Sequence, residues 1–404
     1  MNKPKIRFNE FENIWTKSKL GEIYEVYSGN TPSRSDDRNY QNGEIPWIKT
    51  TDLNNTVICS NEEKISVYGA TKLKVLPEKS VLIAMYGGFN QIGRTGLLAY
   101  PATINQALAA LMPVNEINPN FLLNFLNFKK ESWRNVAASS RKDPNITKND
   151  VEKFKISFPS LDEQSAIGCL FRTLDDLLAS YKDNLANYQS LKATMLSKMF
   201  PKAGQTVPEI RLDGFEGEWG KYYLGDIFEQ VSNYIEPSAE NELWSLTVEK
   251  GLTPKTDRYK RDFLVKKNDK FKKVDVNEFV YNPMNLTLGA LDLNDNEVTI
   301  SVSGYYVVMK NRDIEKFDND FLKILLKTTY AIYQYKQFAT GTLIEKQRVQ
   351  FPTFSEIPFY LPPIAEQQAI GSYFSNLDNL IGAYQEKISQ LETLKKKLLQ
   401  DMFI

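Results

Sequence analysis

The sequence predicts an α+β fold: two α/β domains with mixed sheets, each followed by a long helix, with the two helices forming an antiparallel coiled coil. Three observations lead to this prediction: an internal repeat, a heptad pattern at the end of each copy, and short apolar runs bounded by turn residues. The length of 404 residues also exceeds that of one ordinary domain.

The repeat consists of two colinear blocks with almost the same offset. The first block pairs Ile6-Arg7-Phe8, Trp15 and Leu20-Gly21 with Ile210-Arg211-Leu212, Trp219 and Leu224-Gly225. The second block pairs Pro159, Glu163-Gln164, Tyr181 and Met199-Phe200 with Pro362, Glu366-Gln367, Tyr384 and Met402-Phe403. Residues 26–158 and 230–361, between the blocks, show no obvious alignment. We infer a duplication in which the frame was kept and the inserts diverged.

Each copy ends in a predicted helix of nearly 40 residues, whose apolar positions follow steps of four and three. These positions include Leu174, Tyr181 and Leu185 in one copy and Leu377, Tyr384 and Ile388 in the other. Lys192 and Lys395 occupy the one position of this pattern in each helix that is not apolar. Acidic residues near each start, such as Glu163 and Glu366, suit the helix dipole. At about 1.5 Å per residue, each helix is on the order of 55 Å long.

The shared heptad seam favours pairing of the two helices. A single amphipathic helix usually packs on its own domain, and that is the alternative interpretation. Two head-to-tail copies related by a pseudo-twofold axis can instead cover each other's seams in an antiparallel pair. The length of the helices favours this pair, which we expect to act as a spacer.

Both inserts are predicted to be α+β. The first has apolar runs at 81–86 and 107–112, which are typical of buried strands, and a helix near 120–134. The second has strands at 278–281 and 305–309 and a helix at about 317–337. The order of elements is similar although the residues differ.

Polar residues in the first insert form a candidate nucleic-acid contact. The loop from Ser28 to Arg34 offers hydroxyl, amide and guanidinium donors, which bind phosphates and base edges. An ordinary turn is the alternative interpretation. The candidates in this insert are Ser28, Asn30, Thr31, Ser33, Arg34, Lys49, Gln91 and Arg94.

The second insert contains a basic stretch at residues 250–273, with ten Lys or Arg against three Asp. Because the whole chain has 50 basic and 50 acidic residues, this is a local excess. Its interleaved aromatic residues are typical of nucleic-acid contact, and a solvated surface is the alternative. The candidates within it are Lys255, Arg258, Lys260, Lys266 and Lys267.

Segments after the predicted helices, and a loop after a predicted strand, supply further candidates. They are Ser139, Ser140, Arg141, Lys142, Asn282, Asn285, Thr340 and Thr342. For the residues that follow predicted helices, the alternative to DNA contact is an ordinary loop at the end of a helix.

The composition argues against catalysis in this chain. Histidine is absent, which excludes Ser-His-Asp and Cys-His nucleophilic sites and His-ligated zinc. Cys59 and Cys169 have no CxxC partner, so we expect no disulfide framework and no cysteine metal site. No apolar run approaches the roughly 18 residues of a membrane span, and we expect a cytoplasmic protein without an export signal.

Two segments resemble catalytic motifs only in part. Gly88 to Thr95 resembles a phosphate-binding loop with Arg in place of Lys, but the residues after it predict a strand where the motif needs a helix. Asn282-Pro283 resembles the Asn-Pro-Pro-aromatic motif of adenine methyltransferases, but the second Pro and the aromatic residue are missing. We therefore predict neither an ATP site nor a methyltransferase site.

Together, the duplicated blocks resemble the specificity subunits of type I restriction-modification systems over the full length of the chain. The resemblance is carried by the Ile6-Arg7-Phe8 block and its copy and by the Pro-x-x-x-Glu-Gln motifs at Pro159 and Pro362. The first insert resembles one class of the family's target recognition domain through Ser28 to Arg34, Ile45-Pro46-Trp47 and Asn105-Gln106. The second matches less closely, through Tyr281-Asn282, Gly289-Ala290 and Ser303-Gly304-Tyr305-Tyr306.

The resemblance implies four parts: target recognition domain 1 at 1–160, a central conserved helix at 161–201, target recognition domain 2 at 202–360 and a C-terminal conserved helix at 361–404. Each recognition domain would read one half of a split target in double-stranded DNA, and the helices would set the gap and dock partners. The implied partners are two methyltransferase subunits, which use S-adenosylmethionine, and endonuclease/translocase subunits, which use ATP and Mg²⁺. This chain is then expected to be non-catalytic and to bind no cofactor itself.

Two other classes of protein are the alternatives. A standalone methyltransferase or nuclease requires a catalytic motif, which is missing. A coiled-coil scaffold without a DNA function explains the helices but leaves the basic stretch and the divergent inserts unexplained. Methylation by the chain alone, and salt-sensitive retention on DNA, distinguish these classes.

Overall fold

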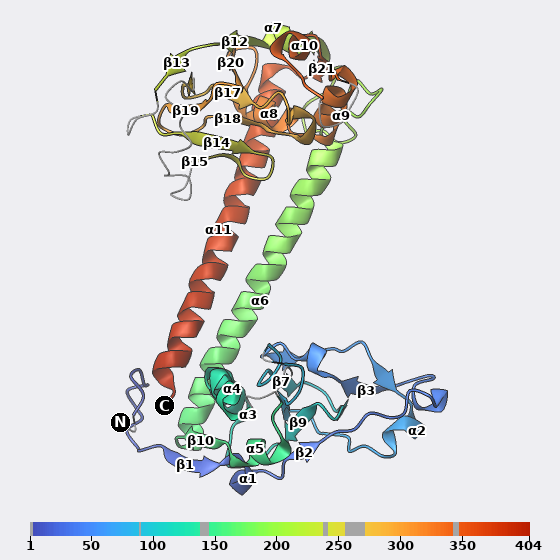
Figure 1. Ribbon diagram of the computed structural model, residues 1–404, viewed down its shortest axis with the longest axis vertical. Coiled ribbons are helices and arrows are strands. Elements are labelled where there is room, and N and C mark those ends of the chain that lie inside the picture. The colour runs from blue at the N-terminus through green and yellow to red at the C-terminus, as the bar shows by residue number, and fades with distance from the viewer. Residues whose placement is uncertain (1–2, 89, 138–144, 237–240, 255–270, 342–346) are drawn as a thin grey trace. The chain divides into compact units, whose positions relative to one another are not determined.

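The computed structural model describes residues 3–88, 90–137, 145–236, 241–254, 271–341 and 347–404 (Figure 1). Contacts divide the chain into two units. The first unit comprises residues 1–183 and 385–404, and the second comprises residues 184–384. Each unit contains one of the two inserts and a part of both long helices.

The first unit is built on two mixed sheets. The larger has the order β2-β9-β6-β7-β4, in which only β4 and β7 pair in parallel. The smaller has the order β5-β3-β8, in which β3 and β8 are parallel. The strands are β2 (Tyr27–Ser28), β3 (Ile45–Ile48), β4 (Val57–Ile58), β5 (Lys64–Ile65), β6 (Val81–Ala84), β7 (Thr95–Leu98), β8 (Thr103–Ile104) and β9 (Leu108–Leu111).

Helices and one ribbon complete the first unit. Strand β1 (Thr16–Lys19) pairs with β10 (Lys155–Phe158). The short helices are α1 (Leu20–Ile23), η1 (Asp37–Asn39), η2 (Thr50–Asp52), α2 (Val67–Ala70) and α5 (Lys148–Lys153). Helix α3 (Pro119–Phe128) packs on β6 and β7 and contributes Phe121 and Phe125 to the core.

The prediction of one helix near 120–134 is wrong in one respect, because the segment forms two helices. Lys129, with φ −86° and ψ 9°, leaves the helical region and separates α3 from α4 (Lys130–Val136). Neither Gly nor Pro marks the break, so the sequence contains no conventional stop signal there.

The second unit repeats the plan of the first. Its larger sheet has the order β12-β20-β17-β18, which corresponds to β2-β9-β6-β7, and its three-stranded sheet has the order β13-β16-β19. Two ribbons, β11–β21 and β14–β15, complete it. The strands are β11 (Gly220–Tyr223), β12 (Phe228–Val231), β13 (Tyr234–Ile235), β14 (Trp244–Thr247), β15 (Gly251–Pro254), β16 (Phe271–Val274), β17 (Phe279–Tyr281), β18 (Leu291–Leu293), β19 (Ile300–Ser303), β20 (Val307–Asn311) and β21 (Pro358–Leu361).

The helix predicted at about 317–337 is also two helices. Thr328 is extended, and its side chain accepts a hydrogen bond from the backbone N–H of Ala331, so a new helix begins there. The helices of this unit are α7 (Leu224–Ile227), η4 (Leu286–Leu288), α8 (Asn319–Leu325), α9 (Thr329–Phe338) and α10 (Phe351–Ser355).

The two long helices are α6 (Leu161–Lys198) and α11 (Ile364–Met402). They run antiparallel within each unit, because residues that come later in α6 meet residues that come earlier in α11. The contacts are Asp175 with Lys395 and Lys182 with Glu392 in the first unit, and Tyr188 with Tyr384 and Lys192 with Asp378 in the second. The predicted antiparallel pairing is confirmed.

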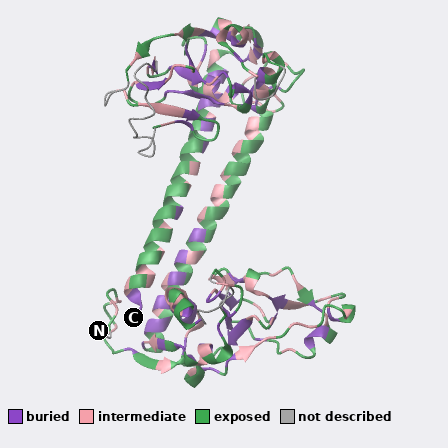
Figure 2. Cartoon of the chain, in the orientation of Figure 1, coloured by how far each residue is buried: buried purple, intermediate pink, exposed green. Residues whose placement is uncertain are grey.

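Burial follows the predicted heptad seam. Leu174, Leu178, Leu377 and Ile388 are buried, whereas much of the remaining helix surface is exposed (Figure 2). The two seam lysines pair with aspartates that are themselves equivalent in the repeat, so both units contain the same bridge.

Candidate nucleic-acid interface

A buried ion pair ties the start of each repeat to its long helix. Arg7 donates to both oxygens of Glu163, at 2.7 Å each, and Arg211 donates to Glu366 at 2.8 and 2.5 Å. Both carboxylates are only 1% exposed. Besides their favourable place near the helix starts, these acids each have a bidentate arginine partner, which the sequence did not indicate.

The glutamine of each Pro-x-x-x-Glu-Gln motif positions the main helix of the insert. Gln164 accepts a hydrogen bond from the backbone of Asn118 at 2.9 Å and donates to the carbonyl of Glu116 at 3.1 Å. Gln367 makes the same contacts with Asp318 and Lys316, at 3.0 and 3.2 Å. These bonds hold the residues that begin α3 and α8.

The equivalent helix starts reveal a third repeated block that the sequence comparison missed. Residues 116–127 correspond to 316–327, at an offset that differs from those of the two other blocks. In both, a glycine of the long helix allows close approach: a Cβ on Gly168 or Gly371 would lie 3.0 Å from the capping side chain of α3 or α8. The signal in the sequence was short, consisting mainly of Phe121-Leu122 and Phe321-Leu322.

The loop from Ser28 to Arg34 is held by donors from neighbouring segments. Ser28 ends β2, at an edge of the larger sheet. Side chains donate to three loop carbonyls: Trp47 to Asn30 at 3.2 Å, Tyr40 to Pro32 at 2.6 Å and Asn39 to Ser33 at 2.9 Å. Thr31 bonds to Gln106 and Ser33 to Ser35. The loop therefore has a fixed shape, and a hollow of 210 Å³ lies beside it.

Arg34 and Lys49, both predicted contacts, share one acidic partner. Lys49 Nζ lies 2.6 Å from Glu63 Oε2, and Arg34 pairs with the other oxygen. The Arg34 guanidinium also lies 4.2 Å from the ring centre of Tyr40 and 5.4 Å from that of Trp47. The structure thus brings the loop and Lys49 into one cluster.

Gln91 and Arg94 lie in a turn between β6 and β7. Arg94 donates to the carbonyl of Asn90 at 3.1 Å, and the amide oxygen of Gln91 is buried without a partner among the described residues. Gly93, with φ +72°, packs against Trp133 of α4. Strand β7 follows the turn, so the predicted strand is confirmed at the place where a phosphate-binding loop requires a helix. Ser139, Ser140, Arg141 and Lys142 lie outside the described residues.

In the second unit, only part of the predicted interface is described. Asn282 accepts a hydrogen bond from the backbone of Met284 at 3.0 Å, and Asn285 is exposed beside η4. Thr340 is exposed and pairs with Arg348 through the backbone. Lys255, Arg258, Lys260, Lys266, Lys267 and Thr342 lie outside the described residues.

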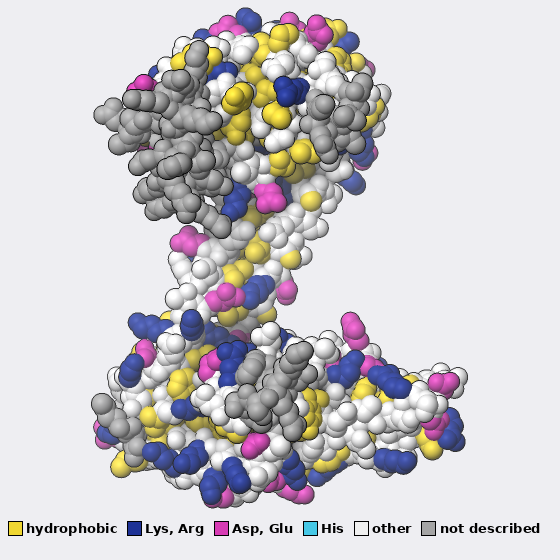
Figure 3. Space-filling model, viewed as in Figure 1, with side chains coloured by type: hydrophobic (Ala, Val, Ile, Leu, Met, Phe, Trp, Pro, Cys, Tyr) yellow, Lys and Arg dark blue, Asp and Glu magenta, His cyan; other side chains and the backbone are white. Residues whose placement is uncertain are grey.

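Two lysines at the end of the basic stretch have structural partners. Lys272 is buried, and its ammonium donates to the carbonyl of Tyr306 at 2.6 Å. Burial lowers its pKa. Lys273 pairs with Asp275 at 2.7 Å. The visible faces of both units carry interspersed acidic and basic side chains (Figure 3), so any DNA contact depends on local groups.

The predicted helix positions are covered to different degrees. Leu174 and Leu377 are buried in the hydrophobic cores of the first and second unit, and Ile388 is buried on α11. Tyr181, Leu185 and Tyr384 are partly covered.

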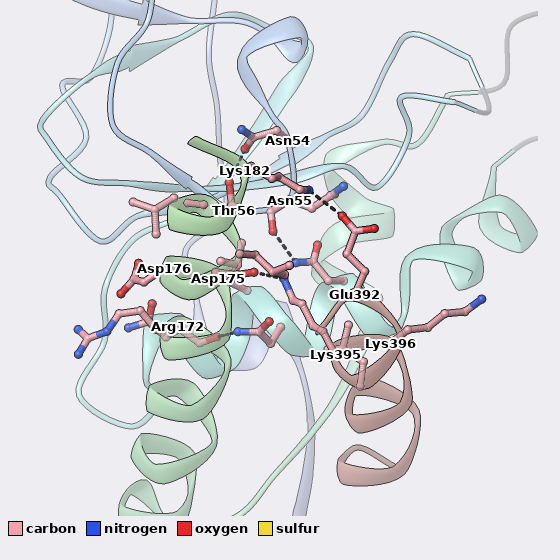
Figure 4. A pocket seen from close by; sticks show the side chains of 18 of the residues that line it. Asn54, Asn55, Thr56, Arg172, Asp175, Asp176, Lys182, Glu392, Lys395 and Lys396 are labelled. Carbon is pink, nitrogen blue, oxygen red and sulfur yellow. Dashed lines mark hydrogen bonds and ion pairs between the residues drawn. The ribbon is translucent and has the colours of Figure 1, made fainter. Parts of the chain in front are cut away.

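Each unit has a cleft between its main insert helix and the long helices. The volumes are 660 Å³ in the first unit and 690 Å³ in the second. One wall of each contains the seam bridge, Asp175 with Lys395 (Figure 4) or Asp378 with Lys192. The clefts are therefore equivalent in position.

The opposite walls of the clefts differ in chemistry. Helix α3 contributes Asn120, Leu123, Asn124 and Asn127 in the first cleft, whereas the equivalent positions in the second are Asp320, Lys323, Ile324 and Lys327. The Oδ1 atom of Asn124 is buried without a partner among the described residues. The first cleft therefore has a polar asparagine at a position where the second has an apolar isoleucine.

The described residues contain neither a metal cluster nor a membrane-spanning helix. No group of three or more Cys, Asp or Glu side chains within the described ranges is arranged to hold a metal ion. None of the helices in those ranges is long and apolar enough to cross a membrane.

The sequence profile described as "Type I restriction modification DNA specificity domain" matches residues 12–187 and 216–393. The chain belongs to this family. The two matches coincide with the two copies of the repeat, so each unit contains most of one specificity domain and part of the helix of the other.

Relatives and solved structures agree with this membership. The chain is 28% identical to a type I restriction enzyme specificity subunit from Escherichia coli, over 45% of each protein. It is 22% identical to the MjaVIII specificity subunit from Methanocaldococcus jannaschii, over 95% of this chain and 91% of that protein. The crystal structure of the S subunit from M. genitalium, at 16% identity, covers 100% of this chain and 99% of its own, with a TM-score of 0.64. The fold is thus that of a specificity subunit.

Proposed function

We propose that this specificity subunit reads a bipartite sequence in double-stranded DNA, each unit reading one half, and directs catalytic partners to it. The observation that carries the proposal is the repetition of one two-sheet domain with different loops on a shared antiparallel helix pair. Two equivalent readers suit a target whose halves lie on antiparallel strands. The chain itself is non-catalytic.

In the first unit, the DNA contact comprises the fixed loop, the Arg34 and Lys49 cluster, and the turn with Gln91 and Arg94. The loop supplies Ser28, Asn30, Thr31 and Ser33, and Ser139, Ser140, Arg141 and Lys142 follow α4. In the second unit we assign Asn282, Asn285, Thr340, Thr342, Lys255, Arg258, Lys260, Lys266 and Lys267. Arginine and lysine side chains bind phosphates and guanine, and amides and hydroxyls read base edges.

The partners are two methyltransferase subunits, which use S-adenosylmethionine, and endonuclease/translocase subunits, which use ATP and Mg²⁺. The clefts lie at equivalent positions and share the Asp–Lys bridge on one wall, which supports two copies of one partner, although their other walls differ. We place the assembly in the cytoplasm and retain the four-part division, with recognition domains at 1–160 and 202–360 and conserved helices at 161–201 and 361–404.

The deciding experiment expresses the chain with its methyltransferase subunit and maps methylated adenines across the genome. We expect a split motif with a fixed gap, and no methylation from the chain alone. A continuous motif contradicts the proposal. As an internal control, exchange of residues 26–158 for those of a homologous domain should change only one half of the motif.

A further inference from the structure

Glu63 has no assigned role, yet it lies at the centre of the Arg34 and Lys49 cluster. It directly precedes β5, and its side chain is 20% exposed, against 59% for Arg34 and 34% for Lys49. The carboxylate therefore lies behind the two cations and not in front of them. A DNA phosphate approaching from solvent meets the cations first.

The cluster fixes the direction of the Arg34 guanidinium in two ways. The rings of Tyr40 and Trp47 hold the guanidinium at their faces, and both rings also bond to the loop that carries Arg34. Glu63 then restrains rotation of the group by pairing with one of its nitrogens. Five N–H donors belong to a guanidinium, so donors remain for a ligand.

The charge of Glu63 persists at neutral pH. Burial alone would raise its pKa, but hydrogen bonds from Lys49 and Arg34 outweigh burial and hold the pKa below its ordinary value. The cluster therefore carries two positive charges and one negative charge, and its attraction for any DNA backbone is weaker than that of two free cations.

We propose that Glu63 is a positioning residue that orients Arg34 and Lys49 toward the DNA and cancels one of their charges, so that binding by this unit depends on sequence. The physical reason is that fixed directions of the two side chains favour contacts with the bases of the target. The cancelled charge weakens contacts with phosphates, which DNA of any sequence offers. This inference rests on the proposed DNA-reading function.

The test compares Glu63→Gln with Glu62→Gln in the full chain assembled with its methyltransferase subunits. Glu62 is adjacent and exposed, and it forms no ion pair with a described residue, so this control removes the same charge without disturbing the cluster. Affinity is measured against salt for three kinds of duplex: the mapped target, targets with one base changed in either half, and an unrelated sequence.

For Glu63→Gln we expect tighter binding to the unrelated duplex, with a salt slope steeper by up to about 0.9, as one more net positive charge requires. Discrimination should fall about fivefold or more for base changes in one half of the target only. Glu63→Asp keeps the charge but shortens the reach, so its salt slope should match the wild type while discrimination falls. Glu62→Gln should leave discrimination unchanged.

Equal behaviour of the Glu63→Gln and Glu62→Gln variants overturns the inference, as does an equal loss of discrimination in both halves of the target. These outcomes are distinct from failure of the proposed function. That failure would show in the wild-type assembly, as a continuous methylation motif or as DNA binding that does not respond to salt.

Discussion

At the residue scale, the frame relies on buried ion pairs that join distant segments of the chain. Arg7 satisfies Glu163 and also donates to the carbonyl of Asn13 at 2.6 Å, so one side chain joins the first residues of the repeat to α6. Breaking one partner of such a buried pair leaves an uncompensated charge, which costs about 3–5 kcal/mol. Because of this cost, losing either the arginine or the glutamate destabilises the protein. Such a pair therefore suits the constant part of the repeat, which holds the variable inserts.

The residues of these pairs were visible in the sequence, but their pairing was not. Arg7 and Glu163 are 156 positions apart, and no periodicity connects them. Likewise, Lys272 appeared to belong to a basic surface, but it is buried beneath Tyr306. Sequence composition shows which charges exist, whereas the tertiary fold decides which of them remain available for a ligand.

The capping residues of α3 and α8 give a prediction about pH. Asp318 caps α8, and burial raises its pKa, whereas the equivalent cap of α3 is the neutral Asn118. Because the folded pKa lies above the unfolded one, the contribution of Asp318 to stability is complete at low pH and is lost as the pH rises through the folded pKa. Asparagine caps a helix about as well as aspartate does.

We therefore expect Asp318→Asn to raise the unfolding midpoint at neutral pH, and this gain should vanish below about pH 4. Denaturant titrations at several pH values measure the effect. Asn118→Asp is the matched control in the first unit and should lower the midpoint at neutral pH. A stabilisation by Asp318→Asn that does not depend on pH would contradict the argument.

At the element scale, periodic segments were predictable and non-local pairing was not. The heptads of α6 and α11 repeat over many turns, which identifies a helix and its buried face. The strands are two to five residues long, and partners such as β2 and β9 are distant in sequence, so their order could not be derived. The break at Thr328 arises from local capping, whereas the Lys129 side chain makes no cap at the other break.

The residues that follow each long helix pack into the core of the unit in which the other long helix begins. Phe403 lies within 5.5–6.3 Å, between ring centres, of Trp15, Phe121, Phe125, Phe128 and Phe171 in the first unit. Phe200 packs on Phe321 and Phe374 in the second. Phe403→Ala should destabilise the first unit by about 3–5 kcal/mol, since it opens a cavity in a packed aromatic cluster.

Hydrogen exchange distinguishes this local effect from general unfolding. Phe403→Ala should increase exchange in α3 more than in α8, and the matched Phe200→Ala variant should do the reverse. Equal acceleration in both helices would show that the two cores do not respond separately.

At the scale of the whole molecule, the proposed function makes the helix pair a ruler for the gap between the half-sites. A heptad added to both α6 and α11 preserves the seam and lengthens each helix by about 10 Å, which is roughly three base pairs of DNA. We expect the methylated motif to keep both halves while its gap widens by about three base pairs, as measured by methylation mapping.

A heptad added to α6 alone is the control, because it mismatches the seam and should reduce methylation without producing a new uniform gap. An unchanged gap after the double insertion would contradict the ruler, because the half-sites would then be spaced by something other than these helices.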